Sequence, residues 1–180
     1  MDKIMIYYTD SYDEKSSHKL LYKATSIHCD ISENDIILNS ERGKKPYFTH
    51  PAHVHFSISH SENVWACAFA PAEVGLDVQT ENHGRNHNRL AERYFHKNEQ
   101  AAVVYSNNSS LVFTQIWSRK EAIVKLLGIG IDKRFAEFDS TDEIVLVDNK
   151  FLNVKNFDLI HGFSSAVAYG NEFIVCVKKI

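Results

Sequence analysis

The chain has 180 residues, 44% of them hydrophobic and 24% charged, and a formal net charge of −3 at pH 7. These values are typical of a soluble globular protein with one moderate domain or two small subdomains. The weakly negative balance gives no indication of nucleic acid as a partner, because nucleic-acid-binding domains carry an excess of positive charge.

Three features of the sequence bear on where the protein works. No apolar run approaches the roughly 18 residues that a membrane-spanning helix needs. The first residues, MDKIMIYYTDSYDEK, start acidic and turn polar at once, unlike a signal peptide. Cys29, Cys67 and Cys176 are odd in number and far apart, which favours reduced thiols over a disulfide framework or a zinc ribbon. We therefore expect a cytoplasmic protein that does not bind a membrane.

In chain order, the first part of the sequence predicts strands around one helix. Residues 3–8 predict a strand, and residues 16–29 a helix whose first serines suit capping. A short strand within 31–48 leads into a Gly-Lys-Lys-Pro turn. Three short strands follow and predict an antiparallel meander, over residues 53–61, 64–70 and 73–79.

The second part repeats this combination of helices and strands. After a polar loop at 80–88 we expect a helix over 89–106, a break at 107–110, and a helix that ends at Gly128. Strands are expected at 135–141, 143–149, 151–157 and within 164–180. We predict an α+β fold of two similar subdomains, residues 1–80 and 81–180, with antiparallel sheets, packed helices and a cleft between them, although no sequence repeat is visible.

The stretch WSRKEAIVKLLGIGI places a lysine on the apolar face of its predicted helix. At 100° per residue, Ile123 lies within about 20° of Ile116 and Lys120 at about 40°. One interpretation is that the Lys120 stem lies along apolar surface with its ammonium in water, while Glu121 and Lys125 form an ordinary i,i+4 pair. The other is that both lysines bind an anion and Glu121 binds a cation.

A second candidate site lies on the predicted strand EVGLDVQ. Strand alternation puts Asp77 and Gln79 on one face, where they could share a cation through oxygen atoms. The simpler interpretation is a half-exposed strand with two solvated polar groups.

Two further segments offer donors for phosphate. Lys44 and Lys45 precede Pro46, whose ring stiffens the turn, and two lysines there suit phosphate as point charges. Ser59 and His60, at the end of a predicted strand, offer two more donors. A solvated turn explains each segment equally well when it is taken alone.

The order and spacing of these segments together resemble the 4′-phosphopantetheinyl transferases. The segments are Lys45-Pro46, FSISHS, GLDVQ, and WSRKEAIVK, whose Glu121 lies 44 residues after Asp77. The resemblance covers about 42–130 and is to the larger monomeric type, which includes the enzyme that activates surfactin synthetase. SHKLLYK near the N-terminus resembles the family's first cofactor-binding helix more loosely. Ala122 resembles the subgroup often linked to non-ribosomal peptide and siderophore pathways.

The resemblance implies an activity and assigns roles to residues. Such enzymes move the phosphopantetheine arm of coenzyme A to a serine of an apo acyl or peptidyl carrier protein and release adenosine 3′,5′-bisphosphate. Mg²⁺ would be held by Asp77, Glu121 and, more weakly, Gln79, where many members have Glu. The predicted coenzyme-binding residues are Lys45, Ser59, His60, Lys120 and Lys125, with His18 and Lys19 as weaker additions. Glu121 is the first candidate for the general base and Glu99 the second, with Lys125 stabilising charge. The type implies a monomer.

The resemblance also implies a docking face, since carrier proteins of these pathways are usually acidic around the modified serine. His83, Arg85, Arg89 and Lys97 form the candidate face, and a solvated loop and helix surface is the alternative.

Two other classes of function stay open on the sequence. One is a non-catalytic relative that binds coenzyme A or a carrier, because a fold does not guarantee an activity. The other is a histidine-metal enzyme, with zinc on the strand HPAHVH through His53 and His55. The thiols or carboxylates that would complete such a site are at no familiar spacing.

Overall fold

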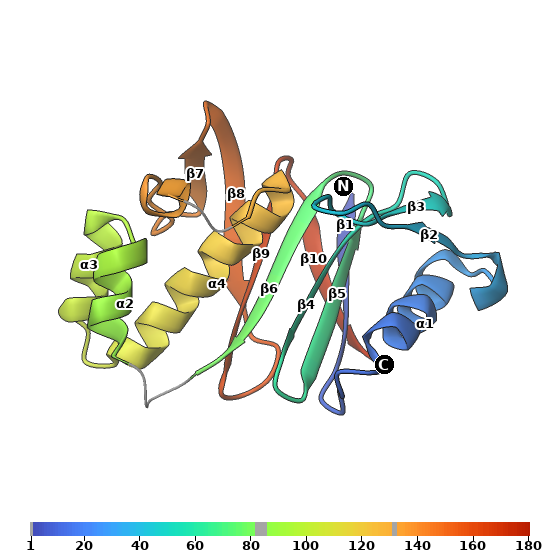
Figure 1. Cartoon of the computed structure of the whole chain (residues 1–180), viewed down its shortest axis with the longest axis horizontal. Helices are drawn as coiled ribbons and strands as arrows, with labels where there is room; N and C mark the ends of the chain where they lie inside the picture. The colour runs from blue at the N-terminus through green and yellow to red at the C-terminus, as the bar shows by residue number, and fades with distance from the viewer. Residues whose placement is uncertain (1, 82–85, 131–132) are drawn as a thin grey trace.

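The computed structural model describes residues 2–81, 86–130 and 133–180 and shows an α+β protein. Two antiparallel-rich sheets lie in the middle, with one helix outside the first sheet and three outside the second (Figure 1). A core of mostly aliphatic side chains from both sheets fills the space between them, while a second and a third core lie under the outer helices. No helix in the described ranges combines the length and apolarity that crossing a membrane requires.

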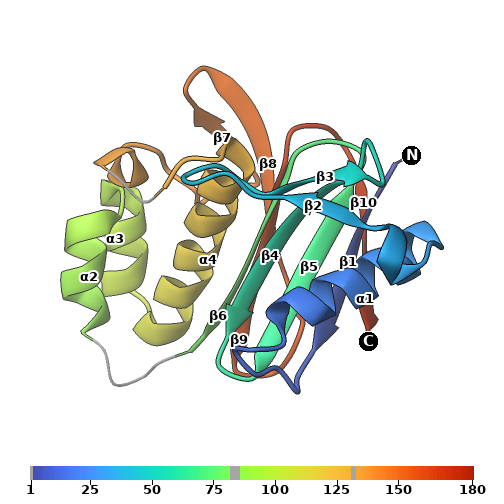
Figure 2. The ribbon, with the colours of Figure 1, turned by 45° about the vertical axis from the view of Figure 1, so that its right-hand side comes forward.

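The first sheet has the strand order β10-β1-β5-β4. Its strands are β1 (Lys3–Thr9), β4 (His55–Ser61), β5 (Val64–Ala70) and β10 (Ile174–Lys179). Helix α1 (Ser17–Cys29) covers the outer face, where its Leu21 and Ala24 pack against Trp65 and Phe69. The short strands β2 (Ile37–Asn39) and β3 (Tyr47–His50) pair with each other, after the 3₁₀ turn η1 (Glu33–Asp35) (Figure 2).

The second sheet has the strand order β6-β9-β8-β7 and is wholly antiparallel. Its strands are β6 (Val74–Thr80), β7 (Ile144–Val147), β8 (Lys150–Phe157) and β9 (Phe163–Tyr169). Its outer face is covered by α4 (Ser109–Leu127), with α2 (His87–Tyr94), α3 (Lys97–Val104) and the 3₁₀ turn η2 (Lys133–Ala136) beyond it.

The two sheets meet where β4 and β6 run side by side. The hydroxyls of Ser57, Ser59 and Ser61 accept hydrogen bonds from the backbone N–H groups of Leu76, Val78 and Thr80, at 3.0, 3.1 and 3.0 Å. Three serine side chains therefore take the place of a backbone ladder and satisfy the edge of β6 that β9 leaves unpaired. We call these six residues the serine seam.

Several elements differ from the sequence-based predictions. The predicted antiparallel pairing of 53–61 with 64–70 is confirmed by β4 and β5. The strand predicted at 73–79 is β6, but it pairs with β9 and not with β5, so the third strand of the predicted meander is wrong. The helix predicted over 89–106 is two helices, because His96 caps α3 and forms a capping box with Glu99. The predicted strand at 135–141 is absent; Phe135 and Phe138 are buried instead against the helices, and η2 begins this segment.

The break predicted at 107–110 is partly wrong, since Asn108 caps α4 and Ser109 already lies in it. The predicted end at Gly128 is confirmed: Gly128 takes a left-handed φ of 67° as the C-cap. The division into 1–80 and 81–180 stays a prediction. Two strands cross it, because β6 joins the second sheet and β10 pairs in parallel with β1 in the first.

Candidate active site

A close contact between β6 and α4 creates the site. A Cβ atom on Gly75 would lie 1.8 Å from the Ala122 carbonyl oxygen and 2.6 Å from the Leu126 nitrogen, so only glycine allows this approach. The predicted alternation of β6 is confirmed, because Val74, Leu76 and Val78 lie in the core between the sheets. Asp77 is therefore on the face that meets α4.

Asp77 is nearly enclosed, with 4% of its surface exposed. Its Oδ1 accepts hydrogen bonds from the Lys125 ammonium at 2.7 Å and from the Ser59 hydroxyl at 2.8 Å. Its Oδ2 is buried and has no hydrogen-bond partner among the described residues. Burial raises the pKa of Asp77, although Lys125 and Ser59 act in the opposite direction. The carboxylate thus has one satisfied oxygen and one that needs a ligand.

Glu121 lies one turn before Lys125 on α4, next to Asp77. Burial and the neighbouring charge of Asp77 raise the pKa of Glu121 to about 7, against a partial offset from Lys125. Two carboxyl groups near one lysine thus carry an excess of negative charge, and one of them holds its proton up to neutral pH. A cation between the carboxylates would relieve this repulsion.

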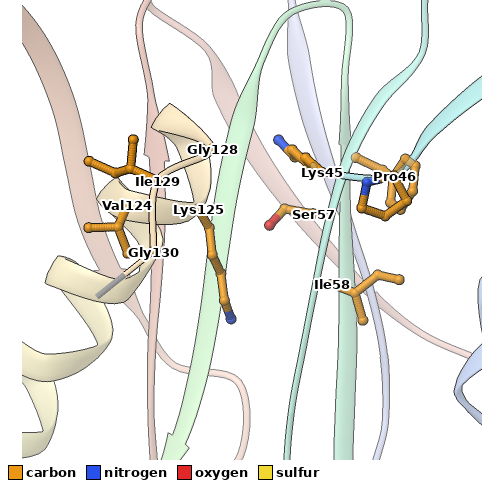
Figure 3. Close-up of a pocket in the computed structure, with 10 residues that line it drawn as sticks. Lys45, Pro46, Ser57, Ile58, Val124, Lys125, Gly128, Ile129 and Gly130 are labelled. Atoms are coloured by element: carbon orange, nitrogen blue, oxygen red, sulfur yellow. The ribbon is translucent and has the colours of Figure 1, made fainter. Parts of the chain in front are cut away.

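A cavity of about 310 Å³ opens beside this cluster, between β4 and the end of α4. Figure 3 shows Lys45, Pro46 and Ser57 on one side and Lys125 with Gly128–Gly130 on the other. Lys45 comes from the part of the chain beside the first sheet, and Lys125 comes from α4, which covers the second sheet. The cavity therefore lies between the two halves of the fold. An anionic ligand fits between two such cations.

At the outer end of the cavity, Lys45 is held by Glu73. The Lys45 ammonium lies 2.8 Å from Glu73 Oε2 and donates to the Val74 carbonyl at 2.8 Å. The other Glu73 oxygen lies 2.8 Å from His55 Nδ1. Lys45 and His55 keep the pKa of Glu73 below its usual value despite partial burial. A phosphate that binds Lys45 would compete with Glu73.

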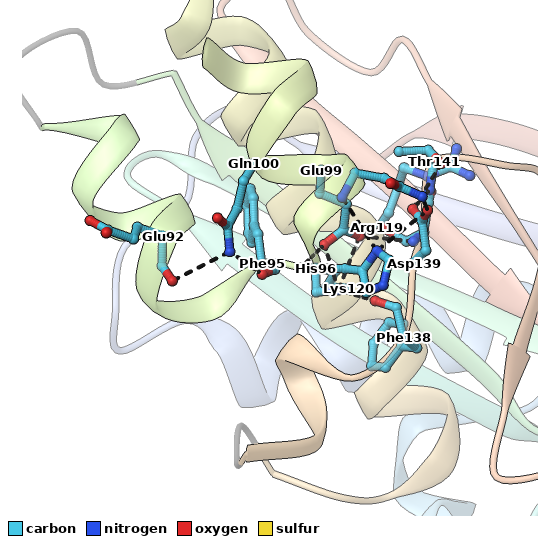
Figure 4. Close-up of polar contacts among 12 residues, drawn as sticks. Glu92, Phe95, His96, Glu99, Gln100, Arg119, Lys120, Phe138, Asp139 and Thr141 are labelled. Carbon is cyan, nitrogen blue, oxygen red and sulfur yellow. Dashed lines mark hydrogen bonds and ion pairs between the residues drawn. The ribbon is translucent and has the colours of Figure 1, made fainter.

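Lys120 lies in a different place from Lys125. It is fully buried, 2.8 Å from Glu99 Oε2, and it donates to the Phe138 carbonyl at 2.7 Å (Figure 4). Its ammonium also lies 4.0 Å from the centroid of the Phe138 ring. Glu99 accepts further bonds from the Ser140 backbone and hydroxyl at 2.8 and 2.7 Å. The prediction that Lys120 is on the apolar face is confirmed, and a protein carboxylate supplies the partner of its charge.

The other predicted site residues are spread over the surface. His18 and Lys19 are exposed on α1, where His18 stacks on Tyr22 at 4.5 Å. His60 is exposed and its ring lies 5.0 Å from that of Tyr12. Gln79 is partly buried and lines a separate cavity of about 220 Å³ with residues of α2 and α4. Of these four, only Gln79 shares the α4-facing side of β6 with Asp77, and it lines a different cavity from Lys125.

Of the predicted docking residues, Arg89 and Lys97 are exposed on α2 and α3. His83 and Arg85 lie outside the described residues. The two histidines proposed for zinc do not share a strand face, because His53 lies in the turn before β4 with a φ of 63° and His55 begins the strand. Across the described parts of the chain, no group of three or more His, Cys, Asp or Glu side chains could hold a metal by itself.

Two neighbouring carboxylates, one of which has an oxygen without a hydrogen-bond partner in the described residues, nevertheless fit a hard divalent cation whose remaining ligands come from a substrate. Mg²⁺ commonly binds one or two carboxylates and completes its shell with water and phosphate oxygens. Asp77 Oδ2 and Glu121 are the residues that would hold it.

Comparison with known proteins places the chain in a family. The model of the 4′-phosphopantetheinyl transferase superfamily matches residues 73–176, which include Asp77, Glu99 and all of α4. The chain belongs to the 4′-phosphopantetheinyl transferase superfamily. Among individual relatives, the 4′-phosphopantetheinyl transferase gsp of Aneurinibacillus migulanus is 26% identical over 78% of this chain and 60% of its own length.

A second relative of the superfamily, 4′-phosphopantetheinyl transferase psf-1 of Bacillus pumilus, is 31% identical over 57% of this chain and 44% of its own length. The chain thus spans only about half of the length of these relatives. A solved structure, holo-[acyl-carrier-protein] synthase of Thermotoga maritima, aligns at 18% identity with a TM-score of 0.41, over 54% of this chain and 61% of that one.

Sequence reasoning missed two features of this candidate site. Glu73 was not considered as the partner of Lys45, because the pair is separated by 28 residues and depends on how the β2–β3 segment packs. The serine seam was missed as well. The repeat Ser57-Ile58-Ser59-His60-Ser61 was its signal, since small hydroxyl side chains at every second position can satisfy a neighbouring backbone.

Proposed function

We propose that this chain transfers the 4′-phosphopantetheine arm of coenzyme A to a serine of an apo acyl or peptidyl carrier protein, as a cytoplasmic monomer. Adenosine 3′,5′-bisphosphate is the second product. Membership of the superfamily supports the reaction class. The observation that carries the proposal is the split environment of Asp77: one oxygen is bonded to Lys125, and the other is buried with no hydrogen-bond partner in residues 2–81, 86–130 and 133–180.

In this proposal Asp77 and Glu121 bind Mg²⁺, and Gln79 is a weaker third ligand with one less negative charge than the Glu of many members. When bound, the ion neutralises charge on the diphosphate of coenzyme A. Lys125 lies between Asp77 and the cavity and contacts a phosphate oxygen. Lys45, at the other end of the cavity, binds a phosphate of the nucleotide portion, where it exchanges Glu73 for the ligand.

The reaction forms one bond from phosphorus to oxygen and breaks another. The carrier serine oxygen attacks the phosphorus next to the pantetheine arm, and the bond from that phosphorus to the bridging oxygen of the nucleotide breaks. Glu121 takes the serine proton in this proposal, because it lies one turn before the cavity-lining Lys125 and a carboxylate within hydrogen-bond reach can act as the general base. Lys125 stabilises the charge that develops on the phosphate oxygens.

The remaining predicted contacts have weaker support. Ser59, His60, His18 and Lys19 stay proposals for the coenzyme's nucleotide end, and Arg89 and Lys97 for carrier docking. Lys120 and Glu99 reach a substrate only if their buried ion pair opens, because both side chains are fully enclosed. We therefore place Glu121 ahead of Glu99 as the base.

The test is a transfer assay with coenzyme A, Mg²⁺ and a panel of apo-carriers, read by intact-protein mass spectrometry. We expect a carrier to gain the mass of one phosphopantetheine arm, and we expect Lys125→Ala to abolish the gain. Lys15→Ala, an exposed lysine before α1, is the matched control and should leave the gain unchanged. If coenzyme A binds and no carrier in the panel is modified, the chain is a non-catalytic coenzyme-binding relative.

A further inference from the structure

Ser59 differs from the two other serines of the seam in what its hydroxyl contacts. All three accept a hydrogen bond from a backbone N–H group of β6, at nearly equal distances. Only the Ser59 hydroxyl also donates to Asp77 Oδ1, at 2.8 Å, and accepts from the Lys125 ammonium, at 3.0 Å. Ser59 therefore connects the seam to the charged cluster.

The hydrogen-bonding capacity of Ser59 is completely used by the protein. A hydroxyl has one donor and two acceptor positions. Here the donor goes to Asp77, and the acceptors go to Val78 N–H and Lys125. The side chain is also buried, with 5% of its surface exposed. A hydroxyl in this state has no donor left for a phosphate of a bound coenzyme.

We propose that Ser59 is a positioning residue: it fixes the rotation of the Asp77 carboxylate so that Oδ1 faces Lys125 and Oδ2 stays available to a divalent cation. The inference rests on the proposed function only in taking the cation to be the one used in transfer. For Ser59, this positioning role replaces the direct contact with the nucleotide end of coenzyme A. Without the hydroxyl, the carboxylate can turn and offer both oxygens to the Lys125 ammonium, which then competes with the cation.

The chain supplies a matched control for this role. Ser61 accepts the same kind of backbone bond as Ser59, from Thr80 at 3.0 Å, but in the part of the chain that the structure describes it makes no hydrogen bond to Asp77 or Lys125. Ser61→Ala therefore removes one seam bond and leaves the carboxylate untouched. Ser59→Ala removes one seam bond and, in addition, the bonds of the hydroxyl to Asp77 and Lys125. The difference between the two variants isolates the positioning effect.

The direct measurement is Mn²⁺ binding to the coenzyme-free protein, followed by electron paramagnetic resonance of free Mn²⁺. We expect Ser59→Ala to raise the Mn²⁺ dissociation constant by about tenfold, the lower end of what losing a hydrogen-bond partner of a metal ligand costs. Ser61→Ala should stay within about twofold of the wild type, since it keeps every bond to the ligand. Equal Mn²⁺ binding by wild type and Ser59→Ala, or equal weakening in both variants, overturns the proposal.

Two further variants guard against a folding defect. Ser59→Thr keeps the hydroxyl and should restore Mn²⁺ binding, whereas Ser59→Cys fills the same space with a weak donor and should not. Tighter Mn²⁺ binding by Ser59→Cys than by Ser59→Thr would contradict a role for the hydroxyl. In active protein, we also expect Ser59→Ala to raise the Mg²⁺ concentration for half-maximal transfer more than the KM for coenzyme A. Mn²⁺ binding can be measured without a carrier, so the two proposals can fail separately. If no carrier is modified but Ser59→Ala still binds Mn²⁺ more weakly than Ser61→Ala and the wild type, the proposed function is wrong and Ser59 remains a positioning residue.

Discussion

The Lys125 ammonium lies 2.7 Å from Asp77 Oδ1, although the two residues are separated by 48 positions in the sequence. This ion pair joins the outer face of β6 to α4, and it borders a cavity whose other wall comes from the first sheet. The contact depends on Gly75, which lets the helix backbone approach the strand. The charged cluster is therefore a consequence of how the second sheet packs against its helix.

Gly75→Ala should separate that strand and helix. The added methyl group would lie 1.8 Å from a backbone oxygen of α4, which cannot move as a flexible side chain does. We expect the free energy of unfolding in urea to fall by about 3 kcal/mol, the upper end of overpacking effects. Gly170→Ala is the control, because a Cβ atom there meets nothing within 4 Å. Equal stability of the two variants would contradict the packing argument.

Glu121→Gln should make the protein more stable at neutral pH while it removes activity. The folded-state pKa of Glu121 is about 7, against 4.5 for an ordinary glutamate. Between these values the folded metal-free chain holds a proton that the unfolded chain has released, so stability is highest below the lower value and falls as pH rises through the window. Glutamine does not titrate, so the variant lacks this contribution to the pH dependence of the free energy of unfolding.

The measurement for Glu121 is urea unfolding of wild type and Glu121→Gln in EDTA at pH 5 and pH 8. The stability advantage of the variant should grow from the lower to the higher pH. Saturating Mg²⁺ should reverse the order at pH 8, because the cation binds the ionised carboxylate and stabilises the wild type alone. An advantage that does not change with pH would show that Glu121 titrates normally.

The buried pair of Lys120 and Glu99 should be important for folding. Removing one partner of a buried ion pair leaves an uncompensated charge and costs about 3–5 kcal/mol. We expect Lys120→Met to lower the free energy of unfolding by that amount, and Lys120→Met with Glu99→Leu to recover much of it. Lys179→Met, which breaks an exposed pair with Asp10, is the control and should have little effect.

The same double variant also tests the predicted catalytic role of Glu99. If the folded double variant still transfers the arm at a rate near that of the wild type, Glu99 and Lys120 are structural. A rate that stays below detection in a protein of normal stability would support Glu99 as a base.

Glu73→Gln should improve the use of coenzyme A. The substitution removes the carboxylate that holds Lys45 and His55, and so frees the lysine for a phosphate. The pair is partly exposed, and we expect the KM for coenzyme A to fall by only about threefold, in line with surface ion pairs. Assays with coenzyme A and its 3′-dephospho form, each at two salt concentrations, measure this. A higher KM for both would mean that Glu73 positions Lys45 for binding.

Local patterns in the sequence predicted the parts of the site that depend on one element. The alternation of β6 placed Asp77 opposite Leu76, and the helical period put Lys120 on the apolar face of α4. The end of that helix followed from Gly128. These features follow from the periods of 2.0 and 3.6 residues and need no knowledge of the partner.

The contacts between elements could not be read in the same way. Glu99 as the partner of Lys120 depends on α3 packing beside α4, and the pairing of β10 with β1 joins opposite ends of the chain. The helix-face argument left the partner of Lys120 open between water and an anion, and the structure supplies a glutamate. Lys120 and Lys125 lie on neighbouring turns of one helix, and the structure buries the first and places the second at the cavity.

The most direct test of the account is anomalous scattering from crystals grown with coenzyme A and Mn²⁺. We predict one Mn²⁺ peak within coordination distance of Asp77 Oδ2, the Glu121 carboxylate and the diphosphate of coenzyme A. Ordered coenzyme A in the cavity without a peak there, or with Mn²⁺ bound only elsewhere, would contradict a metal site built by these two acids.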